Sequence, residues 1–246
     1  MREKINLENL DCTIIIKTIK KRREYLLSLL KFYDHYYEGL KIAIVETADE
    51  ENIYIQQFNN LQIIYEYNAN YNCEAALYRL FRIAKTKYVI EQGDDDLILA
   101  QRLPLLVKAA EISKCDIVSF ESLMINDKDR VSFCTERVKG FLKKLLKLSK
   151  LVLKSGLYLS TPQSNFFLSE ASRLAKFKKK YMMTCFSMIN RKVAKNIYNS
   201  NWLTPKSLNG FGEVTASIHS YILYKTIKIP IIVFLRLEDI KVQSDS

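Results

Sequence analysis

The chain has 246 residues, of which 48% are hydrophobic, and a formal net charge of +11 at pH 7. This composition is enough to bury one substantial core and excludes a disordered, collagen-like or low-complexity protein. The positive charge favours anionic partners, namely nucleic acid, an anionic membrane surface or phosphorylated small molecules, without choosing among them.

Strand and helix patterns alternate along the first half of the chain. Short β-branched or apolar runs predict strands, whereas apolar residues that recur every three or four positions predict helices. In chain order they are a strand at 12–19, a helix at 24–33, strands at 40–45 and 61–65, a helix at 74–85, a strand at 88–90, a helix at 101–113 and a strand at 116–120. This alternation predicts an α/β domain with a largely parallel sheet that ends near residue 122.

The pattern changes after residue 122, and we expect residues 123–246 to form a second region that packs with residues 1–122 as one domain. Residues 138–159 are basic and leucine-rich, and within 138–154 the lysines and most of the apolar residues fall on different faces of a predicted helix. Such a helix either lies in an anionic membrane interface or packs on its own domain with a solvated lysine face. Helices at 191–198 and 214–224 and a strand at 229–235 are also predicted.

The sequence predicts a cytoplasmic protein. Its apolar runs, such as Thr13 to Ile16 and Ile229 to Leu235, are too short to cross a bilayer, and Met1 to Ile15 lacks the features of a signal peptide. The five cysteines include no Cys-x-x-Cys pair, so we expect reduced, mostly buried thiols. His35 and His219 are the only histidines, which argues against a histidine-based metal site.

Three adjacent carboxylates, Asp94, Asp95 and Asp96, follow the predicted strand that begins at Tyr88. Their mutual repulsion would raise their pKa values unless a cation lies between them, and the hard cations Mg²⁺ and Mn²⁺ prefer oxygen ligands. Ligands of open α/β sheets bind at the carboxyl ends of the strands, where this cluster falls. The alternative is an acidic turn that caps a following helix. These residues alone leave both interpretations open.

Several segments, in the right order, resemble family 2 glycosyltransferases, which have the GT-A fold. Residues 13–30 resemble their first strand and helix, residues 42–49 their second strand with its acidic end, and residues 72–96 the block that leads into the Asp-x-Asp motif. The resemblance covers residues 12–121 and continues more weakly to about residue 236. It implies a mostly parallel central sheet flanked by helices, with a smaller mixed acceptor-side region.

The resemblance also implies roles in nucleotide-sugar binding. Thr18 and Glu46 would line the nucleobase pocket, with Asp49 as a substitute for Glu46. Arg79 would reach the base or the phosphates. Arg236 would contact the diphosphate, or it would be an exposed charge at a strand end.

The aspartate cluster would hold the ribose and a Mn²⁺ or Mg²⁺ ion. Members of the family often read Asp-x-Asp-Asp, and this alignment places Gly93 at the first aspartate. Asp94 is therefore a candidate for both the nucleotide-sugar and the metal. Asp95 and Asp96 compete as the principal metal ligand.

Inverting sugar transfer needs a carboxylate that removes the proton of the acceptor hydroxyl. Residues 209–213 resemble the acidic position that follows a glycine-bearing loop in the family, which makes Glu213 the candidate base. Residues 182–191 resemble the strand and the basic residue before that loop. The alternative for Glu213 is a helix N-terminal residue favoured by the macrodipole.

The predicted function is metal-dependent transfer of a sugar from a nucleotide-diphosphate sugar, with a UDP-sugar as the expected donor. The acceptor would be a glycan or a lipid-linked glycan in the synthesis of bacterial surface polysaccharide. The alternative is a basic nucleic-acid- or membrane-binding protein without catalysis, favoured by the clusters at 20–23 and 176–180. No nucleic-acid module frames these clusters, so no specific nucleic acid is expected. A nucleotidyltransferase would need a glycine-rich loop, and residues 18–24 contain no glycine.

Overall fold

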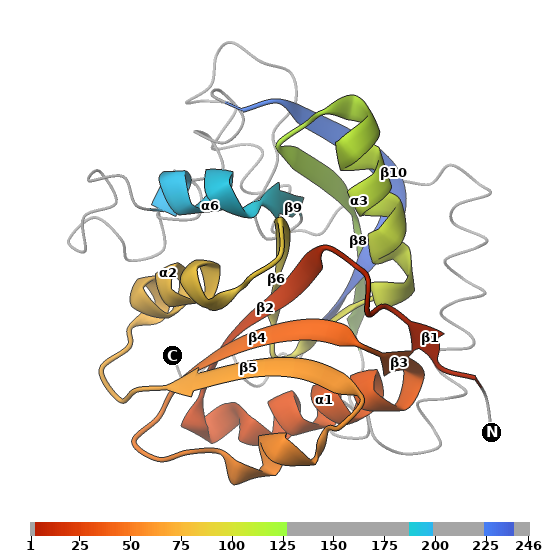
Figure 1. Cartoon of the computed structure of the whole chain (residues 1–246). Coiled ribbons are helices and arrows are strands. Elements are labelled where there is room, and N and C mark those ends of the chain that lie inside the picture. The colour runs from red at the N-terminus through yellow and green to blue at the C-terminus, as the bar shows by residue number, and fades with distance from the viewer. Residues whose placement is uncertain (1–2, 127–186, 199–223, 239–246) are drawn as a thin grey trace.

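The computed structural model describes residues 3–126, 187–198 and 224–238 (Figure 1). The predicted basic helix at 138–154 lies outside these residues, as do Glu213 and all but the last residue of the predicted helix at 214–224. Within the described residues, no helix combines the length and the apolar character that a membrane span requires.

An eight-stranded sheet runs through the structure in the order β5-β4-β2-β6-β9-β8-β10-β7. Its strands are β2 (Cys12–Ile19), β4 (Leu40–Thr47), β5 (Leu61–Tyr67), β6 (Tyr88–Gly93), β7 (Asp96–Ile98), β8 (Ile117–Asn126), β9 (Ser187–Asn190) and β10 (Thr226–Glu238). Strands β5, β4, β2 and β6 are mutually parallel, as are β8 and β10, whereas β9 and β7 run antiparallel to their neighbours. The predicted largely parallel sheet is confirmed.

The helices form between these strands at the positions that the apolar spacing predicts. They are α1 (Arg23–Tyr36), α2 (Cys73–Ile83), α3 (Leu103–Ser113) and α6 (Arg191–Tyr198), with short 3-10 turns η1 (Lys20–Arg22), η2 (Ile53–Gln57) and η3 (Ala100–Arg102). Helix α2 begins after Asn72 because the Asn72 side chain accepts a hydrogen bond from the backbone N–H of Ala75 at 2.8 Å. A small parallel pair of strands, β1 (Ile5–Asn6) and β3 (Tyr37–Glu38), lies beside the main sheet.

Successive residues of β2 pack into two different hydrophobic cores. Ile14 and Ile16 share a core with residues of α1 and α3, whereas Ile15 belongs to a second core with residues of α2 and α6. Side chains of a strand point alternately to the two faces of its sheet, so one run of isoleucines can serve both cores. The result is a sheet covered by helices on both faces, and α2 and α6 lie side by side on one of them (Figure 1).

The sheet continues past the boundary predicted at residue 122. Strand β8 extends to Asn126, β9 lies between β6 and β8, and β10 pairs with both β8 and β7. Strands from both sides of residue 122 therefore complete one sheet, and the division at residue 122 stays a prediction. The thiols of Cys12 and Cys115 are free and buried, as expected, and burial raises the pKa of the Cys12 thiol well above its usual range.

Candidate active site

Several predicted site residues lie at the carboxyl ends of three neighbouring parallel strands, β4, β2 and β6. Thr18 of β2 pairs in register with Glu46 of β4, and Lys17 of β2 pairs with Gly93, the last residue of β6. The aspartate cluster begins at the next residue, Asp94. Parallel strands end at the same edge of a sheet, so residues far apart in the chain meet there.

Asp94 is buried and engaged on both carboxylate oxygens. The Thr18 hydroxyl donates a hydrogen bond to Asp94 Oδ2 at 2.5 Å, and Arg22 Nη2 lies 2.8 Å from Asp94 Oδ1. Burial raises the pKa of Asp94 to about 6, against the opposing effects of the Arg22 charge and the Thr18 hydrogen bond. Asp94 is therefore tied to the ends of β2 and η1.

Arg22 links Asp94 to Asp95. The same nitrogen, Nη2, lies 2.5 Å from Asp95 Oδ2, so one guanidinium group bridges two adjacent carboxylates. Burial by itself lowers the pKa of Arg22, but the charges of Asp94 and Asp95 outweigh it and the pKa rises. Sequence reasoning did not select Arg22 as a site residue, although it belongs to the family-like segment 13–30 and to the basic cluster at 20–23. Its position, one short turn after the end of β2, is the signal that could have identified it.

Gly93 provides the space into which the other two carboxylates project. A Cβ added at Gly93 would lie 2.8 Å from Asp95 Oδ1 and 2.9 Å from Asp96 Oδ2. An aspartate at this position, where the family resemblance expects one, would place its Cβ too close to both carboxylates. Two hard oxygen donors that converge over a glycine suit a Mg²⁺ or Mn²⁺ ion. Across the described ranges, no three His, Cys, Asp or Glu side chains are grouped closely enough to hold a metal on their own.

The alternative that the aspartates cap a following helix is wrong. Asp96 begins strand β7, and α3 starts only at Leu103, with Arg102 as an N-cap residue that makes no side-chain capping bond. The cluster therefore lies in a tight turn between two strands. Helix capping therefore does not explain the aspartate cluster.

A buried hydrogen-bond network holds β7 against β6. The Tyr33 hydroxyl of α1 donates to Gln92 Oε1 at 2.6 Å and accepts the Ile98 backbone N–H at 3.0 Å. Gln92 Nε2 in turn donates to the backbone oxygen of Asp96 at 2.8 Å. Burial raises the pKa of Tyr33 well above its usual range, so its hydroxyl stays neutral. Tyr33 thus contributes to the position of the turn that carries the aspartates.

Glu46, predicted to line the nucleobase pocket, is fully buried and already paired. Arg23 Nε donates to Glu46 Oε1 at 2.7 Å, and the Tyr65 hydroxyl donates to Oε2 at 2.5 Å. Asp49, the predicted substitute, has a side chain that is 69% exposed and lies 2.8 Å from Lys20 Nζ. The structure brings Thr18 and Glu46 together at adjacent strand ends, and it leaves Asp49 on the surface.

Two arginines were predicted to contact the nucleotide-sugar, Arg79 at the base or the phosphates and Arg236 at the diphosphate. Arg79 of α2 makes a two-point ion pair with Glu66, with Nε and Nη2 at 2.5 and 2.8 Å from its carboxylate oxygens. The backbone of Arg236 on β10 pairs with that of Asp96 on β7, so this residue is next to the aspartate cluster in the sheet.

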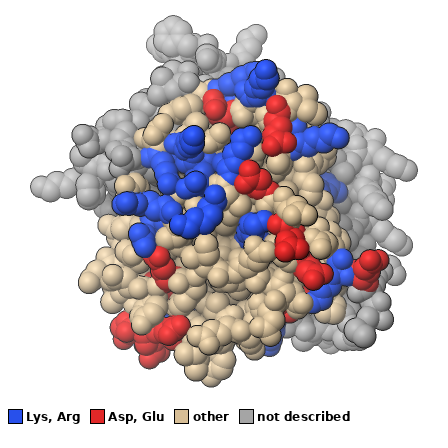
Figure 2. Space-filling view, in the orientation of Figure 1, with Lys and Arg blue, Asp and Glu red and all other residues tan. Residues whose placement is uncertain are grey.

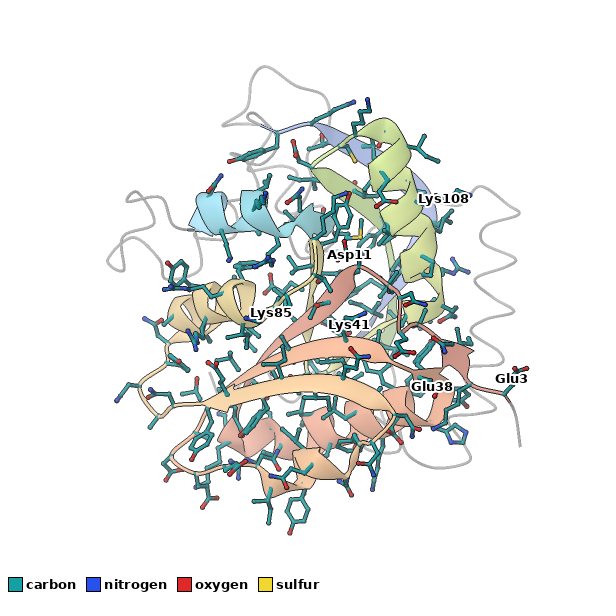
Figure 3. The ribbon with its side chains drawn as sticks, in the orientation of Figure 1. Glu3, Asp11, Glu38, Lys41, Lys85 and Lys108 are labelled. Carbon is teal, nitrogen blue, oxygen red and sulfur yellow. The ribbon has the colours of Figure 1, made fainter. Side chains whose placement is uncertain are left out.

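Lysines and arginines gather on a different part of the surface, over α2 and α6 (Figure 2). This basic surface comprises Arg82, Lys85, Arg191, Lys192 and Lys195. Partial burial lowers the pKa of Lys195, and the charges of Arg191, Arg82 and Lys85 lower it further, so its neighbours are cations. Figure 3 labels Lys85 beside the end of α2. The basic surface lies at the amino end of β6, because Lys87 precedes that strand and its backbone oxygen accepts the Arg191 N–H.

A family model described as Glycosyl transferase family 2 matches residues 13–198. Comparison with curated proteins gives no match. Among solved structures, residues 1–349 of S. aureus TarS are 12% identical with a TM-score of 0.56, covering 92% of this chain and 60% of that one. The same protein with UDP-GlcNAc is 14% identical with a TM-score of 0.55, covering 93% and 58%. The mannosyltransferase PcManGT from Pyrobaculum calidifontis, with GDP-Man and Mn²⁺, is 15% identical with a TM-score of 0.50, covering 93% and 56%.

These comparisons bear on the fold. Identities this low show architecture alone, and the mostly parallel sheet flanked by helices agrees with the predicted GT-A fold, which is confirmed. The chain spans about 60% of the TarS fragment that it resembles.

Proposed function

This chain belongs to glycosyl transferase family 2, and we propose that it transfers a sugar from a nucleotide-diphosphate sugar to a glycan or lipid-linked acceptor, with the help of a divalent metal ion. The observation that carries the proposal is the convergence of Asp95 Oδ1 and Asp96 Oδ2 over Gly93, at the strand edge where α/β sheets bind ligands. The complexes of similar folds with UDP-GlcNAc and with GDP-Man and Mn²⁺ support this donor class and this kind of metal.

We assign Asp95 and Asp96 as the metal ligands among the three aspartates. Asp94 has both oxygens engaged, with Thr18 and Arg22, so direct ligation would require it to give up a partner. Asp94 would then contact the nucleotide-sugar rather than the metal ion, and it holds Thr18 and Arg22 in place. A Mg²⁺ or Mn²⁺ ion bound there would neutralise charge that develops on the leaving diphosphate.

The nucleotide would lie over the ends of β2 and β4. Thr18 and Glu46 are in register there, and Glu46 would act through Arg23 and Tyr65, which take up its carboxylate. Asp49, two residues after the end of β4, is exposed and is the proposed substitute for Glu46 in contacting the nucleotide. Arg236 and Arg79 are the proposed contacts of the diphosphate, although Arg79 must first leave its ion pair with Glu66.

Glu213 is the proposed base of an inverting transfer. Its support is the family-like loop at 209–213, because a base must remove the acceptor proton as the oxygen attacks the anomeric carbon. The basic surface supports a further part of the proposal, a peripheral position on an anionic membrane that carries a lipid-linked acceptor. A role in surface polysaccharide synthesis would follow from such an acceptor.

The test of this function is a screen of UDP-, GDP-, CMP- and dTDP-sugars with Mn²⁺ or Mg²⁺, read by calorimetric binding and by donor turnover. We expect one donor to bind in a metal-dependent manner. Asp95→Asn should abolish that dependence, whereas Glu51→Gln, which removes an exposed acid outside the cluster, should not. If folded protein binds none of the four donors, the proposed function is wrong.

The base has its own test. Glu213→Gln should bind the donor as the unmodified chain does but lose transfer, because only the proton-removing step depends on this carboxylate. Normal transfer by Glu213→Gln would remove Glu213 from the mechanism without affecting the donor-binding assignment.

A further inference from the structure

We propose that Arg22 is a resident cation of the aspartate cluster, which competes with the divalent metal ion until the diphosphate of the donor arrives. This inference rests on the proposed function, because it concerns the same site. It adds a residue outside the Asp-x-Asp motif and an order of binding.

The position of Arg22 carries the first step. Its Nη2 lies 2.8 Å from Asp94 Oδ1 and 2.5 Å from Asp95 Oδ2, between carboxylates that would otherwise repel each other. A guanidinium group is charged at every physiological pH, so this compensation does not depend on pH. Without donor, the cluster therefore already has a cation.

The second step is the conflict with a metal ion. A metal ion bound to Asp95 Oδ1 would be a second cation on a carboxylate whose other oxygen, Oδ2, already contacts Arg22. Two positive charges would then lie on opposite oxygens of the Asp95 carboxylate. Cations this close repel each other strongly even where solvent screens part of the field. The three carboxylates carry three negative charges, and Arg22 already offsets one of them, so a divalent ion is attracted less strongly than it would be without Arg22.

The third step is the way in which Arg22 is attached. Its Nε is buried without a hydrogen-bond partner among the described residues, and its ion pairs with Asp94 and Asp95 both run through Nη2, so a movement of this one nitrogen would release both carboxylates. The guanidinium also lies 5.5 Å from the ring centroid of Tyr25, which offers a second position for it. The side chain is 26% exposed, so a ligand at the edge of the sheet can reach it.

A nucleoside diphosphate resolves the conflict. Its phosphate oxygens supply new negative charge, and guanidinium groups bind phosphate well. Arg22 would leave Asp95 for the diphosphate while the metal ion takes the carboxylates over Gly93. Metal and nucleotide should therefore bind cooperatively, and the metal alone should bind weakly.

The experiment is a Mn²⁺ titration followed by electron paramagnetic resonance, without nucleotide and with UDP or GDP. Unmodified protein should bind Mn²⁺ weakly alone and roughly tenfold or more tightly with the cognate nucleotide. Arg22→Gln should bind Mn²⁺ alone roughly tenfold more tightly, because the competing charge is gone. The control Lys21→Gln removes the same charge from an exposed position of the same turn and should behave as the unmodified protein.

Arg22→Met provides a second neutral variant that keeps an apolar stem against Tyr25, in case Arg22→Gln folds poorly, and circular dichroism checks both. The proposal is wrong if a folded neutral variant binds Mn²⁺ alone no more tightly than unmodified protein. Failure of the proposed function looks different. In that case no nucleotide-sugar binds to any variant, whatever the Mn²⁺ affinities are.

Discussion

The hydroxyl of Thr18 donates a 2.5 Å hydrogen bond to the buried carboxylate of Asp94, 76 residues later in the chain. This bond joins the carboxyl end of β2 to the first residue of the aspartate cluster. It also occupies one of the two oxygens of Asp94, which directs the metal assignment to Asp95 and Asp96.

Thr18→Val should destabilise the protein. Valine has nearly the shape of threonine but leaves Asp94 Oδ2 buried without its donor, at a cost of about 1–3 kcal/mol in the free energy of unfolding. Urea denaturation measures this change in the free energy of unfolding, and Thr18→Ser is the control because serine keeps the hydroxyl. Equal stability of the valine and serine variants would show that the bond contributes nothing.

Gly93→Ala should weaken Mn²⁺ binding and leave the fold in place. The new Cβ would meet Asp95 Oδ1 and Asp96 Oδ2 at 2.8 and 2.9 Å, and these carboxylates would have to move apart. Calorimetric titration of Mn²⁺ in the presence of nucleotide measures the effect.

Gly39→Ala is the matched control for this substitution. Gly39 has φ of +71°, and its added Cβ would meet the backbone of Glu8 at 2.6 Å. It precedes the amino end of β4, whereas the aspartates follow the carboxyl end of the parallel strand β6. It should lower the melting temperature without changing Mn²⁺ affinity of the folded fraction. The reverse pattern would contradict the role given to Gly93.

The stability of the metal-free protein should fall as pH rises through about 6. Burial raises the pKa of Asp94 from 3.8 to about 6, so the folded protein keeps a proton that the unfolded chain has lost. The stabilising contribution is complete below 3.8 and is lost through about 6, with a total on the order of 3 kcal/mol. Denaturant unfolding from pH 4 to 7 in EDTA measures it, and Asp94→Asn should lack this component of the pH dependence.

Charge reversal on the basic surface should weaken attachment to anionic vesicles. Lys85→Glu combined with Lys192→Glu should lower binding to phosphatidylserine-containing vesicles roughly tenfold or more, since each basic residue near such a surface contributes about 1 kcal/mol. Sedimentation with vesicles measures it. Lys108→Glu on α3 is the control, because this exposed lysine lies on another element (Figure 3). Equal binding of all variants would reject the basic surface as a membrane contact.

Much of the fold could be predicted from the sequence because strand and helix periods are local. The β-branched run at 12–19 became β2 with the predicted bounds, and the leucine spacing after Glu24 became α1. The position of Asp94 to Asp96 at a strand end also followed from the order of elements. The short strand β7 was missed, because three residues carry no readable period.

Apolar spacing and chain order suffice to predict the α/β architecture and the edge of the sheet at which the aspartates lie. The pairing of Arg22 with Asp94 and Asp95, the use of Glu46 by Arg23 and Tyr65, and the space over Gly93 were decided by the tertiary structure. The sequence could not show these contacts because they join residues of separate strands and turns, and only the parallel register of the sheet brings them within hydrogen-bond distance.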